Sequence, residues 1–253
     1  MRGVLVTGAS RGIGRATAAA FARRGDRVAV HFAHDRAAAE ETLASLPGEG
    51  HVLVPGDLAD PAEAQRVAEV AGRALGGVDV LVNNAGVAPS AETAHPVTSV
   101  SYEHWQRVWR RTLDVNLLGA ANLTYWVANH LVGRGVPGRI VNVGSRGAFR
   151  GEPDDPAYGA SKAALHSFGQ SLALALAPHG ISVASVAPGF IATDRQAHKL
   201  SGATGDLTRA QSPFNRVGTP DEVAAAILYL ASPEATWASG TILDLNGASH
   251  LRT

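Results

Sequence analysis

The sequence contains no cysteine among its 253 residues. This absence excludes a disulfide framework, a thiol nucleophile, an iron–sulfur cluster and any zinc site built on thiolates. Any chemistry must therefore use oxygen or nitrogen groups or a bound cofactor, and we expect no metal site.

Charge of one sign is also lacking, because 22 Lys and Arg residues balance 22 Asp and Glu residues. A chain without net charge has no overall field that attracts nucleic acid or anionic lipid. Its apolar runs are shorter than the roughly 18 to 20 residues that cross a membrane. Met1 and Arg2 lead directly into a strand pattern, with no signal-peptide pattern. We therefore expect a cytoplasmic protein that binds neither nucleic acid nor membranes.

Hydrophobic residues make up 45% of the chain, enough for a full core. Short apolar runs alternate with longer helical stretches, and most of these runs are continuous rather than alternating. Continuous runs are typical of parallel strands that are covered by helices on both faces. The seven expected strands are Gly3–Val6, Arg27–Phe32, His51–Val54, Val78–Val82, Arg139–Val143, Ile181–Val186 and Thr241–Leu245. The pattern predicts an α/β fold: one doubly wound, Rossmann-like domain over residues 1–253, with a seven-stranded parallel sheet.

Helical periodicity fills the intervals between these strands. Asp60 with Pro61, and Thr219 with Pro220, are typical of an N-cap followed by the first helical residue. The expected helices are Ile13–Arg24, Arg36–Leu46, Pro61–Leu75, Tyr102–Val132, Ala157–Ala177 and Asp221–Ala231. Residues 189–213 contain no strand pattern and little helical pattern, and loops this long are often functional. We expect this segment to be a substrate lid; a surface insertion is the alternative.

A glycine-rich turn follows the first strand and precedes the first helix. It comprises Thr7, Gly8, Ala9, Ser10, Arg11, Gly12, Ile13 and Gly14, and all of these except Ala9 are expected to contact the cofactor. Glycines allow backbone N–H groups to approach a pyrophosphate, and the helix N-terminus favours the same negative charge. The turn's place after the first strand of an alternating α/β chain indicates a dinucleotide site.

Tyr158 and Lys162 lie four residues apart, and so share one face of a predicted helix. A phenol has a pKa near 10, and an adjacent ammonium group lowers it toward neutrality. Ser145 follows the expected fifth strand, at the edge of the sheet where α/β folds bind ligands.

Taken in order, these motifs resemble the short-chain dehydrogenase/reductase family, of the type called classical. The glycine spacing, the Asn83–Gly86 run, Asn116, Ser145, the Tyr158 and Lys162 pair, and Pro188 with Gly189 all follow the family's order. The resemblance implies that Tyr158 exchanges a proton with the substrate oxygen and that Ser145 polarises the carbonyl. It implies that Lys162 lowers the tyrosine pKa and binds the nicotinamide ribose, and that Asn116 positions a water.

The same resemblance implies the cofactor contacts. Asp57 and Leu58 would contact the adenine, with a helix N-cap as the alternative role of Asp57. Asn84 and Ala85 would line the adenine ribose, and Gly86 would also contact the cofactor. Near the nicotinamide, the expected contacts are Pro188, Gly189, Ile191 and Thr193.

The preferred nicotinamide cofactor depends on the loop after the second strand. A carboxylate suits a free ribose, whereas a 2′-phosphate favours a cation. Phe32 occupies the position where relatives that prefer NAD have an acid, and Arg11, with Arg36 or His34, could bind the phosphate. We therefore expect NADP(H), with NAD(H) as the alternative if Asp35 reaches the ribose.

Within the family, the chain most resembles the 3-oxoacyl-carrier-protein reductases. The resemblance implies a reductase of a ketone or 3-oxoacyl group that also works as an alcohol dehydrogenase. The substrate would be a small carbonyl or alcohol compound, possibly carrier-bound, although Val136 and His179 stand where some relatives have basic carrier-binding residues. A homotetramer or homodimer is expected. The alternative is a sensor or scaffold that binds NAD(P) without turnover.

Overall fold

A computed structural model describes residues 1–193 and 202–252. Seven strands form one parallel sheet in the order β3-β2-β1-β4-β5-β6-β7. Their bounds are β1 Gly3–Val6, β2 Arg27–Phe32, β3 Val52–Pro55, β4 Val80–Asn83, β5 Gly138–Val143, β6 Ile181–Pro188 and β7 Ile242–Leu245. The predicted fold class is confirmed, and each expected strand lies within two residues of its observed bounds.

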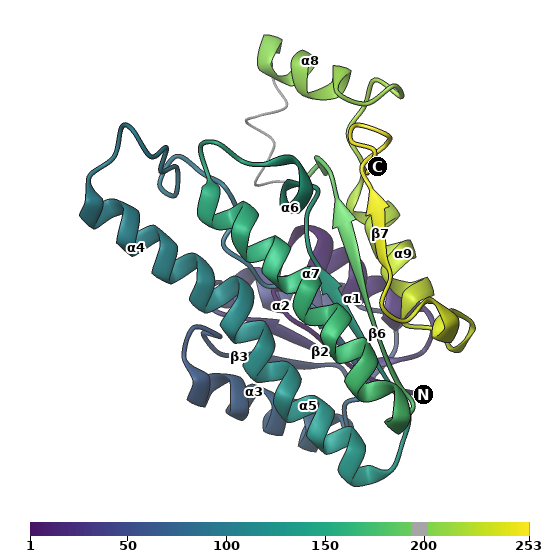
Figure 1. The fold of residues 1–253 in the computed structure, drawn as a ribbon. Coiled ribbons are helices and arrows are strands. Elements are labelled where there is room, and N and C mark those ends of the chain that lie inside the picture. The colour runs from purple at the N-terminus through teal and green to yellow at the C-terminus, as the bar shows by residue number, and fades with distance from the viewer. Residues whose placement is uncertain (194–201, 253) are drawn as a thin grey trace.

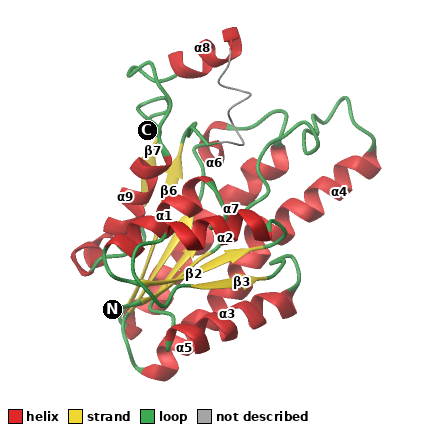
Figure 2. Ribbon diagram, turned by 180° about the vertical axis from the view of Figure 1, so that it is seen from behind, coloured by secondary structure: helices red, strands yellow, loops and turns green. Residues whose placement is uncertain are grey.

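Helices connect the strands and lie on both faces of the sheet, as the opposite views in Figures 1 and 2 show. They are α1 Gly12–Arg23, α2 Arg36–Ser45, α3 Pro61–Leu75, α4 Tyr102–Leu113, α5 Ala120–Arg134, α6 Gly147–Arg150, α7 Pro156–Leu176, α8 Gly202–Ala210 and α9 Pro220–Leu230. Shorter turns are the π-helix η1 Asp114–Gly119 and the 3₁₀ turns η2 Ala177–His179 and η4 Pro233–Ala238. None of the described helices is long and apolar enough to cross a membrane.

Alternating strand residues serve two separate cores. Val4 and Val6 point to the face where α1 and α9 contribute Phe21 and Ile227. Leu5 points to the opposite face, where it joins Val67 and Leu75 of α3 and Leu123 of α5. A strand buried on both sides must be apolar at every position, which is why these strands read as continuous apolar runs.

Capping residues begin the helices where the sequence predicted. The Asp60 side chain accepts a hydrogen bond of 2.9 Å from the Ala62 amide at the start of α3. Thr219 and Glu222 form a reciprocal capping box at the start of α9. Each cap satisfies amides that lack a partner within the helix.

The stretch Tyr102–Val132, expected as one helix, is helical throughout, but its middle is a π-helix rather than an α-helix. The structure has α4, then the π-helix η1, then α5. Gly119 of η1 passes so close to Leu58 that an added Cβ would lie 2.6 Å from the Leu58 carbonyl oxygen. A π turn is frequent at functional sites, and this one carries Asn116.

The segment 189–213 also differs from expectation, because α8 lies within it. This helix projects beyond the body of the domain, at the top of Figure 1. Residues 194–201 of the expected lid lie outside the described residues. The lid itself stays a prediction.

The strand order creates a crevice in the middle of the sheet. β1 pairs with β2 on one side and with β4 on the other. The connections that leave β1 and β4 therefore diverge to opposite faces, and ligands of open α/β sheets bind at such a point, outside the carboxyl ends of the strands.

Candidate active site

A cleft of about 1140 Å³ opens at the carboxyl ends of the central strands. Typical small-molecule sites measure roughly 300 to 1,000 Å³. Most of the predicted site residues line it: Gly8, Ser10, Arg11, Gly12, Ile13, Gly14, His34, Asp57, Leu58, Asn84, Ala85, Gly86, Ser145, Tyr158, Lys162, Pro188, Gly189, Ile191 and Thr193. Thr7, Arg36 and Asn116 are placed differently.

The glycine turn forms the floor of the cleft. Gly8 and Gly12 have φ values of 62° and 54°, a left-handed conformation that favours glycine. A Cβ on Gly14 would lie 2.2 Å from the Gly8 carbonyl oxygen. Arg11 occupies the N-cap of α1, yet its side chain caps no helix amide. The first amides of α1 thus have no side-chain cap, as in helix N-termini that bind anions.

Thr7 joins this turn to the end of β4 rather than lining the cleft. Its Oγ1 accepts hydrogen bonds from the amides of Asn84 (2.8 Å) and Ala85 (2.9 Å). In return, the Asn84 side chain donates to the carbonyl oxygens of Thr7 (2.8 Å) and Gly8 (3.1 Å). The two chain segments that flank the crevice are therefore locked together.

His31 supports the same turn, and sequence reasoning missed it. Its Nδ1 accepts a hydrogen bond of 3.2 Å from the Gly8 amide, and its Nε2 lies 2.9 Å from the Gly56 carbonyl oxygen. These partners require the neutral ring with its proton on Nε2. Burial lowers the pKa of His31 to about 4. The sequence did contain a signal for this role, namely a histidine within an otherwise apolar strand.

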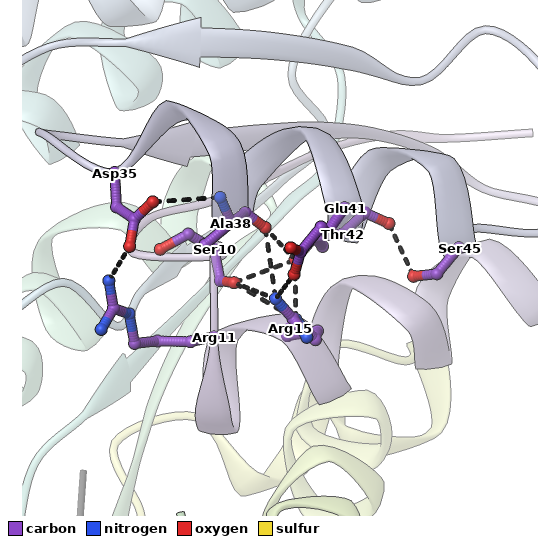
Figure 3. Close-up of polar contacts among 8 residues, drawn as sticks. All are labelled: Ser10, Arg11, Arg15, Asp35, Ala38, Glu41, Thr42 and Ser45. Carbon is purple, nitrogen blue, oxygen red and sulfur yellow. Dashed lines mark hydrogen bonds and ion pairs between the residues drawn. The ribbon is translucent and has the colours of Figure 1, made fainter. Parts of the chain in front are cut away.

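At the end of the cleft between the glycine turn and α2, Arg11 forms an ion pair with Asp35 (Figure 3). Asp35 is also the N-cap of α2, where it accepts a hydrogen bond of 3.0 Å from the Ala38 amide. Arg36 points elsewhere: its guanidinium lies 3.3 Å from Glu40 and over the Phe32 ring. Arg11 and His34 are thus the predicted phosphate ligands that the structure brings to the cleft.

Arg15 holds the turn against α2. Its guanidinium donates to the Ser10 carbonyl oxygen (2.8 Å) and to Thr42 Oγ1 (2.8 Å), as Figure 3 shows. Thr42 donates a second bond, of 3.0 Å, to the same Ser10 oxygen. The backbone of Ser10 is therefore fixed before any ligand binds.

Asp57 has a partner that the sequence did not reveal. Burial acts to raise the pKa of Asp57, but the hydrogen bond from the Ala59 amide and the Arg111 guanidinium outweigh it and lower that pKa. The Arg111 Nη1 atom lies 2.9 Å from Asp57 Oδ2. Arg111 comes from α4, 54 residues away in sequence, so no local pattern could have found the pair.

Lys162 lies buried beneath Tyr158 on α7. Its Nζ lies 5.9 Å from the centroid of the Tyr158 ring and donates a hydrogen bond of 2.8 Å to the Val143 carbonyl oxygen. Burial lowers the pKa of Lys162 to about 8. The ammonium group is therefore still charged at neutral pH, directly beside a half-buried phenol.

Asn116 is buried next to these two residues. Its Oδ1 accepts from the Val87 amide (2.7 Å), and its Nδ2 donates to Ser161 Oγ (3.0 Å). Gly86 leaves room for the side chains of Asn116 and Lys162, because a Cβ at Gly86 would lie 3.2 Å from Asn116 Oδ1 and 3.5 Å from Lys162 Nζ. Asn116 thus connects the loop after β4 to α7.

Ser145 lies where β5 ends. Its Oγ accepts a hydrogen bond of 3.0 Å from the Gly147 amide. A serine hydroxyl that accepts from a backbone amide keeps its own proton to donate. The hydroxyl is thereby positioned as a donor in the cleft.

Comparisons with known proteins agree with this geometry. The family described as Enoyl-(Acyl carrier protein) reductase matches residues 8–250. The chain belongs to the short-chain dehydrogenase/reductase family. The predicted resemblance is thereby confirmed, and the protein is an oxidoreductase by family.

Individual relatives differ in their named substrates. An L-rhamnose 1-dehydrogenase (NAD(P)(+)) from Sphingomonas sp. is 38% identical over 98% of this chain and 96% of the relative. A 3-oxoacyl-[acyl-carrier-protein] reductase from Vibrio cholerae is 34% identical over 98% of this chain and 96% of the relative. The crystal structure of a short chain dehydrogenase from Burkholderia cenocepacia in complex with NADP superposes with a TM-score of 0.86. It is 32% identical and covers 98% of this chain and 97% of that one.

This short-chain dehydrogenase/reductase has a second cavity, of about 350 Å³, beside the first. The two hollows share Arg146, Phe190 and Ile191 in their walls. Segments near the C-terminus and after α8 complete the second cavity, including Gln211, Phe214 and Ser249. The second cavity therefore extends from the wall that it shares with the cleft toward β7.

Proposed function

We propose that this short-chain dehydrogenase/reductase is an NADPH-dependent reductase of a ketone or 3-oxoacyl group, and that it also oxidises the corresponding alcohol. The observation that carries this proposal is the charged, buried Lys162 beside Tyr158, in the same cleft as Ser145 and the glycine turn. A protein that only binds a nucleotide needs the turn but has no need of this acid–base pair.

The cleft suits NADP(H). The uncapped amides of α1 and the left-handed glycines fit a pyrophosphate, and Arg11 supplies a cation for a 2′-phosphate. The NADP complex of the Burkholderia relative supports the same assignment. In this proposal Asp57, Leu58 and Asn84–Gly86 bind the adenosine end, whereas Pro188, Gly189, Ile191 and Thr193 bind the nicotinamide end.

NADPH, when bound, supplies the hydride. Tyr158 donates its phenolic proton to the carbonyl oxygen during reduction, or accepts the alcohol proton during oxidation. Ser145 donates a hydrogen bond to that oxygen and stabilises the charge that develops on it. Lys162 lowers the pKa of Tyr158 and binds the nicotinamide ribose, and Asn116 positions a water that links Lys162 to solvent.

We also propose that the chain assembles as a homotetramer or homodimer. Exposed apolar side chains on α5 support a covered surface there: Tyr125 is 59% and Trp126 36% exposed. Analytical ultracentrifugation would reveal a monomer if this is wrong.

The test of the reductase is NADPH oxidation, with NADH in parallel, against a 3-oxoacyl thioester, a vicinal diketone, a cyclic ketone and a quinone. Turnover that Tyr158→Phe abolishes while NADPH still binds supports the proposal. Undiminished turnover in Tyr158→Phe contradicts the role of the phenol. Tight NADPH binding without turnover of any ketone favours a cofactor sensor or scaffold instead.

A further inference from the structure

Arg146 directly follows Ser145 and occupies the wall between the two cavities. Its backbone is fixed by a hydrogen bond of 2.9 Å from its amide to the Pro188 carbonyl oxygen. Only 5% of its surface is exposed. A charged group this buried normally has an ion-pair partner, because removing it from water is costly.

Among the described residues, the partners of the Arg146 guanidinium are neutral. Its Nη1 donates to Ser249 Oγ (2.6 Å), and its Nη2 donates to Gln211 Oε1 (3.1 Å). The Phe190 ring lies 5.1 Å from Cζ. These bonds use two of the five N–H donors of an arginine. Three donors have no hydrogen-bond partner within residues 1–193 and 202–252, and a ligand in the cavity could accept from them.

The neighbouring carboxylates of the second cavity are already paired with other arginines. Glu222 binds Arg216 at 2.6 Å, and Asp244 binds Arg252 at 2.7 Å. Among the described residues, no carboxylate lies within ion-pair distance of Arg146. Among the residues that the structure describes, the cavity therefore contains one buried positive charge without an ion-pair partner.

A second arginine adds to this charge. Arg150 Nη1 donates to the same Gln211 oxygen at 2.8 Å, so two guanidinium groups converge on one amide. Burial, and next the charge of Arg150, lower the pKa of Arg146. An anion bound beside these two guanidinium groups would offset the repulsion between them.

We propose that the substrate is a ketone that carries a carboxylate, and that Arg146, assisted by Arg150, binds this carboxylate in the cavity beside Ser145. The inference rests on the proposed reductase function and specifies its substrate class. Phe190, Ile191 and Phe214 form apolar walls around the charge, which suits a carbon chain between the ketone and the carboxylate.

The acids around the first cleft favour a carboxylate over a phosphate. Glu152, Asp154 and Asp155 line that cleft near Tyr158, and the Glu152 carboxylate acts to raise the pKa of Arg146. A singly charged group meets less repulsion from these acids than a phosphate, whose charge is close to two.

The first test measures binding without turnover. The NADP⁺-saturated protein is titrated with hexanoate, hexanamide and hexyl phosphate, and dissociation constants are taken from thermal shifts. We expect hexanoate to bind about tenfold or more tightly than hexanamide, because a charge-assisted pair replaces neutral contacts. Equal affinity for these two, or tighter binding of hexyl phosphate, overturns the carboxylate assignment.

Variants assign the preference to Arg146. Arg146→Gln should abolish it, Arg146→Lys should retain part of it, and Arg150→Gln should reduce it. Arg110→Gln removes an equal charge from an exposed position on α4 and should change nothing. If Arg146→Gln does not fold, the lysine and Arg150 variants decide, since an unchanged preference in both overturns the site.

The second test measures kcat/KM for 3-oxohexanoate and 5-oxohexanoate against their methyl esters. We expect the native protein to prefer the acids, and the ratio of kcat/KM for acid over ester to fall to about one in Arg146→Gln. Turnover of esters without any preference overturns the Arg146 site and leaves the reductase. The protein could also bind carboxylates preferentially and yet reduce no ketone, including the four compounds that test the reductase. That result overturns both the reductase function and the substrate assignment.

Discussion

Arg11 and Asp35 form an ion pair that connects the glycine turn to the N-terminus of α2. Both side chains are 44% exposed, so the pair contributes little to stability. Its consequence is for the cofactor: the cation that favours a 2′-phosphate lies beside the acid that favours a free ribose.

Replacing Asp35 with Asn should therefore strengthen NADPH binding and weaken NADH binding. The amide keeps the N-cap acceptor for Ala38 but removes the charge that competes for Arg11. We expect a change of about tenfold in the ratio of the two dissociation constants, as for one charge-assisted contact. Fluorescence titration with both nucleotides measures it.

Glu41→Gln is the matched control for this substitution. Glu41 lies on the same helix and reaches Arg15 at 3.5 Å, rather than Arg11. An unchanged ratio in this control with a shifted ratio in Asp35→Asn supports the role of the ion pair. A ratio that Asp35→Asn leaves unchanged contradicts it.

His31 predicts that the protein loses stability as the pH falls below neutrality. Its pKa is about 4 when folded against 6.5 when unfolded, so between these values the unfolded chain binds more protons and stability rises with pH. The stability is complete above pH 6.5. By pH 5 the loss from His31 is about 2 kcal/mol, measurable by urea denaturation at a series of pH values.

His166 contributes in the same direction, because burial lowers its pKa to about 4 as well. His166→Gln should therefore reduce the dependence of the free energy of unfolding on pH, and the part of this dependence that comes from His31 should remain. His130 is exposed on α5, and His130→Gln should leave the slope unchanged. Stability that does not change between pH 7 and 5 would contradict the neutral, buried state of both rings.

Lys162 predicts a second pH effect, on cofactor affinity. With a pKa of about 8 in the free protein, its ammonium group is charged below pH 8 and loses its charge above it. NADP⁺ affinity should fall by about twofold from pH 7 to 8 and then by up to tenfold per pH unit, because in the proposed role only the charged form binds the ribose well.

This measurement is best made in Tyr158→Phe, which removes the titration of the phenol. Lys162→Gln in the same background should bind NADP⁺ more weakly at every pH and show no decline above pH 8. A decline that persists in the glutamine variant would assign the effect to another group.

Gly14 predicts a steric effect on the turn. A Cβ there would lie 2.2 Å from the Gly8 carbonyl oxygen and 2.9 Å from the Ala9 Cα, so Gly14→Ala must displace backbone. We expect a destabilisation of about 1 to 3 kcal/mol, typical of overpacking, together with weaker NADP⁺ binding. Thermal denaturation and nucleotide titration measure the two effects.

Gly133 of α5 is the matched helical control, since nothing lies within 4 Å of a Cβ placed there. Gly133→Ala should stabilise the protein by about 0.5 to 1 kcal/mol, because alanine favours the helix. Equal effects at both positions would show that Gly14 is not sterically required.

Local patterns in the sequence determined much of this protein. Continuous apolar runs between helical stretches require a parallel sheet covered on both faces, and Asp60 and Thr219 set where α3 and α9 begin. The glycine turn and the four-residue spacing of Tyr158 and Lys162 were also readable. Each of these signals depends on residues that are close in sequence.

Only the tertiary structure decided which distant side chains meet. The Gly8 amide binds His31, and Asp35 faces Arg11, because β1 and β2 end side by side. Arg111 reaches Asp57 from α4, an element that follows β4 in the chain. The burial of the Arg146 guanidinium was likewise evident only from the tertiary structure. Hydrophobic periodicity shows on which face of an element a residue lies. A contact between distant segments depends on how the elements between them are arranged in space, and no local pattern contains that information.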